Sequence, residues 1–148
     1  MTRCYVASPL GFTDAGRDYY ERVYLPALSQ VVEVVDPWSL TKPEEVQAAL
    51  RAGEGPAMMS RIGERNIAAI RSCSLLAAYL DGQEPDSGTV AEVGYGAGLG
   101  IRCFGLRTDL RESGETGVPV NLQVDAFIRA SGGKIVNSLD ALVAALAA

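Results

Sequence analysis

The feature that most limits the fold is an unbroken apolar run, Leu75 to Leu80, that leads into a polar loop and a new helix. Such a run is typical of a strand covered on both faces, as strands in parallel sheets are. The segments Asp81-Gly82 and Pro85 to Gly88 carry turn-forming residues. In an open α/β sheet, ligands bind beyond the carboxyl ends of the strands. The loop after residue 80 is therefore the first candidate site.

The rest of the chain repeats this alternation of strand and helix patterns. Strands are predicted over residues 3–7, 31–35, 75–80, 101–106 and 134–136, and helices over 13–30, 43–51, 57–72, 89–98, 120–131 and 139–148. This order predicts an α/β protein with a five-stranded parallel sheet and helices on both faces. Right-handed crossovers would make it a flavodoxin-like (Rossmann-like) three-layer sandwich. A chain of 148 residues is expected to form a single domain over residues 1–148.

Two of the predicted helices contain residues that oppose helix formation. Pro26 lies inside the first one, where proline kinks or shortens a helix. Gly94, Gly96 and Gly98 lie in the helix after the loop, and each interior glycine costs about 0.5–1 kcal/mol relative to alanine. Three glycines in one helix indicate close approach of its backbone to the sheet or to another subunit. Their spacing is not that of a dinucleotide-binding loop.

The composition excludes several classes of function. The chain has no histidine, which excludes histidine general bases, Ser-His and Cys-His nucleophiles and histidine metal ligands. Its net charge is −5 and its basic residues are scattered, so we expect no nucleic-acid partner. No apolar run approaches the ~20 residues that span a bilayer, and the start of the chain resembles no signal peptide. The three widely spaced cysteines are interpreted as buried reduced thiols of a cytoplasmic protein.

Three carboxylates, Asp81, Asp86 and Glu92, lie within twelve residues of the loop and the following helix. A structural explanation exists for two of them. Thr89 to Glu92 fits a capping box, in which the glutamate bonds back to the amide of the N-cap residue. Asp86 and Ser87 have side chains that serve as loop or cap residues. The spacing alone therefore does not distinguish a helix cap from an active site.

A family resemblance favours the active site. Leu80-Asp81-Gly82, Asp86-Ser87-Gly88-Thr89 and Glu92-Val93-Gly94-Tyr95 together resemble the signature of the nucleoside 2-deoxyribosyltransferase family. Tyr5 to Leu10, Arg107 to Arg111 and Val120 to Leu122 resemble further segments of that family in the same order. The similarity runs from about Arg3 to about Ile128, which is most of the chain.

The resemblance implies a reaction and the residues that perform it. The family exchanges the base of a 2-deoxynucleoside through a covalent deoxyribosyl-enzyme, by two displacements like those of retaining glycosidases. Glu92 matches the nucleophile, Tyr5 the tyrosine that positions it, and Asp86 the acid that bonds the sugar hydroxyls. We expect Glu92 in the first turn of its helix, where the helix dipole favours its anion. Nucleosides and free bases are the implied partners, and no metal or organic cofactor is implied.

The remaining candidate residues are predicted to bind substrate. They are Ser8, Pro9, Leu10, Asp81, Ser87, Gly88, Asn121 and Gln123. Asn121 matches a residue that reaches the site from a neighbouring subunit, so the resemblance implies a homo-oligomer with shared active sites. Without the resemblance, Asn121 would be interpreted as a helix-start residue and Tyr5 as a tyrosine packed in a strand.

One position departs from the family pattern. An aspartate that handles the proton of the leaving base is expected at the start of the central strand, where this chain has Ser74. Asp81 or a water molecule takes over this role, the base preference differs, or transfer is slow. Two alternatives to the transferase therefore remain: a nucleoside or nucleotide N-glycosidase, with Ser8 or Arg107 near a 5′-phosphate, and a non-catalytic nucleoside-binding protein.

Overall fold

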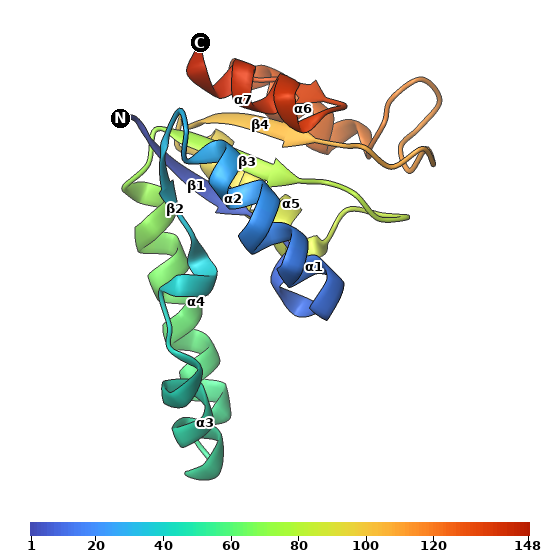
Figure 1. Cartoon of the computed structure of the whole chain (residues 1–148). Coiled ribbons are helices and arrows are strands. Elements are labelled where there is room, and N and C mark those ends of the chain that lie inside the picture. Colours follow the sequence, from blue (N-terminus) through green and yellow to red (C-terminus); the bar gives the residue numbers. More distant parts are fainter.

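The computed structural model describes all of residues 1–148 and contains one sheet of five strands. The strands are β1 (Arg3–Ala7), β2 (Glu33–Val35), β3 (Leu75–Tyr79), β4 (Arg102–Leu106) and β5 (Ile135–Val136). They lie in the order β2-β1-β3-β4-β5, and every pairing is parallel (Figure 1). The predicted five-stranded parallel sheet is therefore confirmed.

Helices cover both faces of this sheet (Figure 1). One face packs against α1 (Asp14–Tyr19), α2 (Leu25–Leu28) and α7 (Leu139–Ala147), and the other against α4 (Gly55–Arg71), α5 (Ser87–Gly98) and α6 (Leu122–Ala130). Strand β1 shows how the sequence builds both layers, because successive side chains of a strand point to opposite faces. Cys4 and Val6 belong to the core under α2 and α7, whereas Tyr5 and Ala7 belong to the core under α4 and α5.

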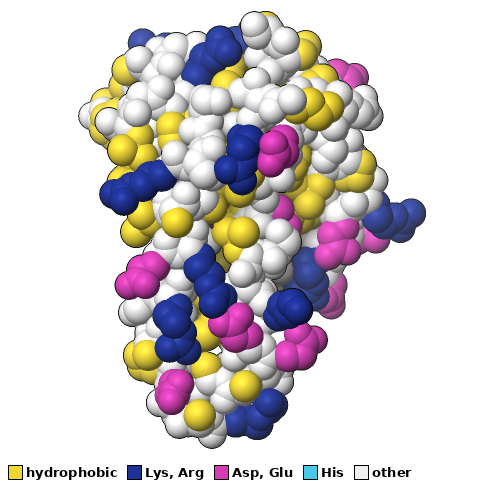
Figure 2. Space-filling view, turned by 90° about the vertical axis from the view of Figure 1, so that its left-hand side faces the viewer, with side chains coloured by type: hydrophobic (Ala, Val, Ile, Leu, Met, Phe, Trp, Pro, Cys, Tyr) yellow, Lys and Arg dark blue, Asp and Glu magenta, His cyan; other side chains and the backbone are white.

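Helix α3 (Pro43–Arg51) pairs with α4 in a hairpin that reaches away from the sheet (Figure 1). Figure 2 shows acidic, basic and apolar side chains mixed on one face of this hairpin, in the lower part of the view. No helix of the protein is both long enough and apolar enough to cross a bilayer. The three cysteines are buried free thiols.

The predicted helix over residues 13–30 is interrupted. Between α1 and α2 lies a π-helical segment, Tyr20–Tyr24, in which the amide of Leu25 donates to the carbonyl of Tyr20. Pro26 is the second residue of α2 and directly follows this turn, whose wider hydrogen-bonding pattern leaves a backbone carbonyl without a donor and so accommodates a residue that has no N–H. The proline conflict seen in the sequence is resolved by this widened turn rather than by a break.

Helix α5 begins at Ser87, two residues before the position predicted for it. Asp86 is the N-cap, and its Oδ2 accepts bonds from the Thr89 amide (2.8 Å) and the Thr89 hydroxyl (3.1 Å). The interpretation of Thr89 to Glu92 as a capping box is therefore wrong. Glu92 lies in the second turn, so the expectation that it occupies the first turn and faces the strongest part of the helix dipole is wrong as well.

The glycines of α5 differ in their surroundings. A Cβ atom on Gly96 would lie 3.1 Å from Leu76 Cδ1, so this glycine lets the helix lie close to β3. Gly94 faces the ring of Phe127 in α6, whose nearest atoms would be 3.8 Å from an added Cβ. Gly98 has open space around it. Close approach to the sheet is therefore confirmed for Gly96.

Candidate active site

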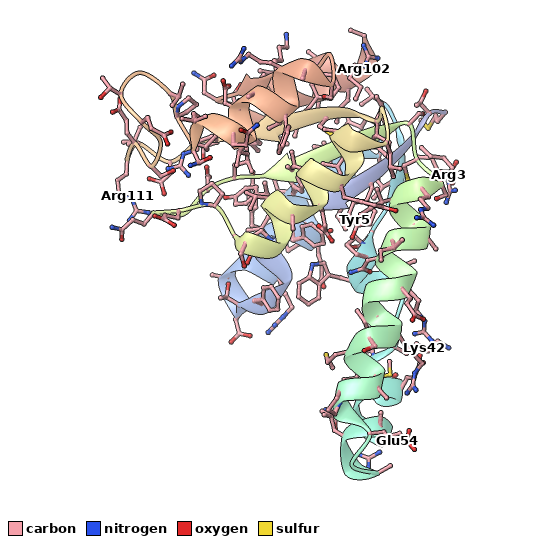
Figure 3. The ribbon with its side chains drawn as sticks, turned by 180° about the vertical axis from the view of Figure 1, so that it is seen from behind. Arg3, Tyr5, Lys42, Glu54, Arg102 and Arg111 are labelled. Atoms are coloured by element: carbon pink, nitrogen blue, oxygen red, sulfur yellow. The ribbon has the colours of Figure 1, made fainter.

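The centre of the site is a hydrogen bond between two elements far apart in the sequence. Tyr5 of β1 is fully buried, and its hydroxyl donates to Glu92 Oε1 of α5 over 2.6 Å. Figure 3 shows Tyr5 between α4 and α5. The other carboxylate oxygen of Glu92, Oε2, makes no hydrogen bond within the protein. The sheet therefore orients this glutamate and leaves one of its oxygens free.

The surroundings of Glu92 shift its protonation. Burial is the main cause that raises the pKa of Glu92, from an ordinary value of 4.5 to about 7, and the nearby Asp86 carboxylate adds to the rise. The bond from Tyr5 acts in the opposite direction. Burial and the Glu92 charge raise the pKa of Tyr5 far above its ordinary range, so Tyr5 stays a neutral donor. A partly desolvated carboxylate with one free oxygen is suited to attack an electrophilic carbon.

Glu92 opens into a cavity of about 600 Å³. The loops after β1 and β2, the α3–α4 hairpin and the start of α5 form its walls. The lining residues are Ser8, Phe12, Pro37, Trp38, Thr41, Pro43, Val46, Gln47, Leu50, Met59, Ile62, Asn66, Asp86, Gly88, Thr89 and Glu92. The volume is in the range of pockets that enclose a whole small-molecule ligand.

The loops that follow β1 and β2 hold Trp38 in the cavity wall. Its indole Nε1 donates to the carbonyl of Ser8 over 3.2 Å, and its ring meets that of Phe12 edge-on, with 4.7 Å between centroids. Gly11 makes this packing possible, because a Cβ atom there would lie 2.3 Å from the indole. A flat aromatic wall beside the carboxylates is suited to a sugar ring or a nucleobase.

Asp86 also faces the cavity. As the N-cap of α5 it uses Oδ2 for Thr89, and its Oδ1 makes no hydrogen bond within the protein. Gly88 lies beside it, and a Cβ atom there would be 3.2 Å from Asp86 Oδ2. The capping role predicted for Asp86 and a free oxygen in the cavity are thus compatible.

The structure brings together only part of the predicted site. Ser8, Asp86, Gly88 and Glu92 line the cavity with Tyr5 beside it, whereas Pro9, Leu10, Asp81, Ser87, Asn121 and Gln123 do not line it. Leu10 packs instead with the core on the opposite face of the sheet.

Both carboxylate oxygens of Asp81 accept hydrogen bonds from the loop that follows β4. Its Oδ1 accepts from the amides of Thr108 (2.5 Å) and Asp109 (2.9 Å), and its Oδ2 accepts from the Thr108 hydroxyl. Asp109 in return accepts from the amide of Gly82 over 3.2 Å. Asp81 therefore ties two loops together.

Asn121 and Gln123 lie at the start of α6 on the exposed surface. Asn121 is the N-cap, and its Oδ1 accepts from the Gln123 amide over 2.9 Å. Its Nδ2 lies 3.4 Å from Glu115 Oε1. Neither side chain reaches the cavity of its own chain, and both are open to a second copy.

Ser74, which stands where the family aspartate was expected, is not part of the cavity, whereas Asn66, which was given no role from the sequence, is. Ser74 is exposed at the amino end of β3, where its amide donates to the Arg3 carbonyl, and it does not line the cavity. Asn66 of α4 does line the cavity, and its Oδ1 is buried without a hydrogen-bond partner. Asn66 shares a face with Ile62, four residues earlier, and this spacing was the only signal in the sequence.

The cavity does not have the composition of a metal or phosphate site. No group of three or more cysteine, aspartate or glutamate side chains is arranged to hold a metal ion. No lysine or arginine lines the cavity. Its polar groups are carboxylates, hydroxyls and the amides of Gln47 and Asn66, which is a set that hydrogen-bonds neutral sugars and bases.

Comparison with protein families identifies the chain. The model of the nucleoside 2-deoxyribosyltransferase family matches residues 4–130. The chain belongs to this family. A comparison with curated protein sequences gives no match.

Solved structures agree with this assignment. A 2-deoxyribosyltransferase from Leishmania mexicana is 26% identical, with a TM-score of 0.68 over 97% of this chain and 95% of that one. A conserved protein from Enterococcus faecalis V583 is 21% identical, with a TM-score of 0.68 over 99% and 97% of the two chains. A CMP N-glycosidase from Clostridium botulinum is 15% identical, with a TM-score of 0.59 over 96% and 94%. The last two share the fold.

Proposed function

We propose that this nucleoside 2-deoxyribosyltransferase family member transfers 2-deoxyribose between nucleobases through a covalent ester on Glu92. The observation that carries the proposal is the Glu92 carboxylate itself. It is held by Tyr5 over 2.6 Å, has one free oxygen, and lines a cavity of about 600 Å³. Such a group is positioned as a nucleophile, and the chain needs no histidine to activate it.

The reaction consists of two displacements. A free oxygen of Glu92 attacks C1′ of the nucleoside, and the bond from C1′ to the base breaks with its electron pair leaving on the base. The base then takes a proton from water or from a neighbouring acid. In the second step a nitrogen of the incoming base attacks C1′ and gives up its proton to water or to a neighbouring carboxylate, while the ester bond breaks and its electron pair returns to Glu92.

The other cavity groups bind the two halves of the substrate. Asp86 Oδ1 accepts a bond from a sugar hydroxyl, close to the nucleophile. Gln47 and Asn66 lie on the hairpin and bond the polar edge of the base; the unpartnered Asn66 Oδ1 is ready to accept from an exocyclic amine. The lack of a basic side chain in the cavity supports a nucleoside rather than a nucleotide as substrate.

The proposed enzyme works as a homo-oligomer. Asn121 and Gln123 lie exposed at the start of α6, away from the cavity of their own chain. In the proposed assembly they complete the site of a neighbouring copy. Cross-linking, or light scattering at two protein concentrations, tests whether the protein is oligomeric.

The experiment that tests the reaction is incubation with deoxyinosine and adenine, followed by chromatography. Formation of deoxyadenosine that disappears in Glu92→Ala supports transfer through Glu92. Glu84→Gln, at an exposed glutamate of the loop before α5 that makes no hydrogen bond, is the matched control and keeps the activity.

Hydrolysis of the same ester is the second candidate. It is favoured by the free Oδ1 of Asp86, which can take a proton from a water molecule that attacks C1′. Release of hypoxanthine without deoxyadenosine would identify the hydrolase. Binding of nucleosides without cleavage of any bond would contradict both enzymatic proposals.

A further inference from the structure

We infer that the preferred base carries an apolar substituent, which lies between α3 and α4 beyond Asn66. This inference rests on the proposed function, because it takes the cavity at Glu92 to be a nucleoside site. It concerns the part of the cavity farthest from the sheet, which neither the sugar nor an unsubstituted base accounts for.

The first observation is the order of side chains along α4. Asn66, Ile62 and Met59 all line the cavity, at intervals of four and three residues, so they share one face of the helix. Asn66 is nearest the sheet, because Ala69 and Ile70 just after it are buried in the core. At 1.5 Å per residue, Met59 lies about 10 Å farther along the helix toward the tip of the hairpin.

Helix α3 runs in the opposite direction, with Pro43 at its start nearer the sheet. Its cavity residues are Pro43, Val46, Gln47 and Leu50, with Leu50 nearest the tip. Apart from Gln47 on α3, the walls beyond Asn66 are therefore apolar. Figure 3 shows the hairpin extending from the level of Tyr5 down to Glu54 at its tip.

The second observation is that this apolar wall is open to solvent. Leu50 is 57% exposed and Met59 is 50% exposed, although both line the cavity. Exposed apolar side chains that gather in one concave site mark a place where an apolar ligand group binds. The wall is continuous with the cavity that holds Glu92, so a group attached to the substrate itself reaches it directly.

The position of the substituent follows from the chemistry of a purine. The sugar is bonded to N9 and lies at the carboxylates, and the exocyclic nitrogen of adenine is on the opposite side of the ring system. An alkyl or aryl group on that nitrogen points away from the sugar. It would extend past Asn66 and cover Leu50, Met59 and Ile62.

Binding of free bases tests the inference without requiring turnover. The dissociation constants of adenine and N6-benzyladenine are measured by calorimetry on the wild-type protein. Because even one methylene in an apolar pocket changes affinity by about tenfold or more, N6-benzyladenine is expected to bind at least about tenfold more tightly. Equal or weaker binding of N6-benzyladenine overturns the inference, and it is also the result expected if a second copy fills the space.

Two variants of the same helix make the test specific. Met59→Gln places a polar group in the apolar wall, and the ratio of the two dissociation constants is expected to fall toward one. Ile67→Gln is the matched control, because Ile67 is a 42% exposed apolar residue of α4 that does not line the cavity. This control is expected to keep the wild-type ratio. A ratio that is the same in Met59→Gln as in wild type overturns the inference.

The outcome is separable from that of the proposed function. Conversion of deoxyinosine and adenine without preference for the substituted base would leave the transferase proposal intact and remove the inference. Tight binding of N6-benzyladenine without exchange of any base would support the inference and contradict the transferase proposal. The rates with adenine and with N6-benzyladenine as acceptors then show whether the substituted base is also the better substrate.

Discussion

Asp81 lies in the loop from β3 to α5 and Glu92 in α5 itself, and the two carboxylates differ in how many hydrogen bonds they accept. Asp81 accepts three hydrogen bonds from the loop after β4, which use both of its oxygens. Glu92 accepts one, from Tyr5, and keeps one oxygen free in the cavity. The comparison shows that the number of donors already satisfied, rather than the residue type or its place in the sequence, separates a structural carboxylate from a reactive one.

The loop around Asp81 is further tied by Arg107, which follows β4. This side chain is only 4% exposed, and its guanidinium donates to the carbonyls of Leu80 (2.5 Å), Gly82 (2.9 Å) and Arg111 (2.7 Å). These donors are used within the protein and lie outside the Glu92 cavity. Arg107 and Asp81 therefore both hold the loop after β3 against the loop after β4.

The largest effect is expected from Glu92→Gln, because the amide is a poor nucleophile of nearly the same shape. We expect the rate of base exchange to fall by at least about a thousandfold, which is the scale on which loss of a nucleophile acts. Chromatography of the products measures it. Retention of more than a tenth of the wild-type rate would contradict the role of Glu92, and Glu84→Gln controls for loss of a negative charge in the same region.

Asp81→Ala tests the other side of the comparison. Two amides and one hydroxyl lose their acceptor, so we expect the free energy of unfolding to fall by about 2 kcal/mol. Urea denaturation measures this change. The rate per folded molecule is expected to stay within about threefold of wild type, since Asp81 lies outside the cavity. A large rise in KM with unchanged stability would instead support the substrate-binding role predicted for Asp81 from the sequence.

The contrast between the two residues also marks the limit of sequence-based prediction. The sheet follows from apolar runs such as Leu75 to Tyr79, whose pattern is local. The start of α5 cannot be predicted from a local pattern, because Asp86 and Thr89 are both good cap residues and only the fold selects Asp86. The far wall of the cavity, with Asn66 in it, depends on where the α3–α4 hairpin lies relative to the sheet. Tertiary packing sets the position of this hairpin. The only trace of it in the sequence is the helical spacing that puts Asn66 on the same face as Ile62.

Tyr5→Phe removes the one bond that Glu92 accepts. In the wild-type protein we expect kcat/KM to rise with pH and level off above about 7, because the Glu92 anion is the nucleophile. The Tyr5 bond lowers the pKa of Glu92, so its loss moves the inflection to higher pH. We expect the rate at pH 7 to fall by about tenfold to a hundredfold. An unchanged inflection in the pH profile would show that Tyr5 does not influence the charge of Glu92.

The smallest effect is on stability, and here a substitution of Glu92 is expected to stabilise the protein, whereas a substitution of Asp81 destabilises it. Glu92 has a pKa of about 7 in the folded protein against an ordinary value of 4.5, so the folded state binds the proton more tightly than the unfolded state does. The stabilisation from this protonation is complete below pH 4.5 and is lost as pH rises through about 7.

Above that pH the protein carries a partly desolvated carboxylate, which Glu92→Gln removes while the glutamine oxygen can still accept from Tyr5. We therefore expect Glu92→Gln to raise the free energy of unfolding at pH 8 by about 1–2 kcal/mol relative to wild type. At pH 4 the difference is expected to be close to zero, because wild-type Glu92 is then protonated in the folded state and largely protonated in the unfolded state. Urea denaturation at both pH values measures the two differences. A variant less stable than wild type at pH 8 would show that the Tyr5–Glu92 pair stabilises the fold, and Glu92 would then resemble Asp81 rather than contrast with it.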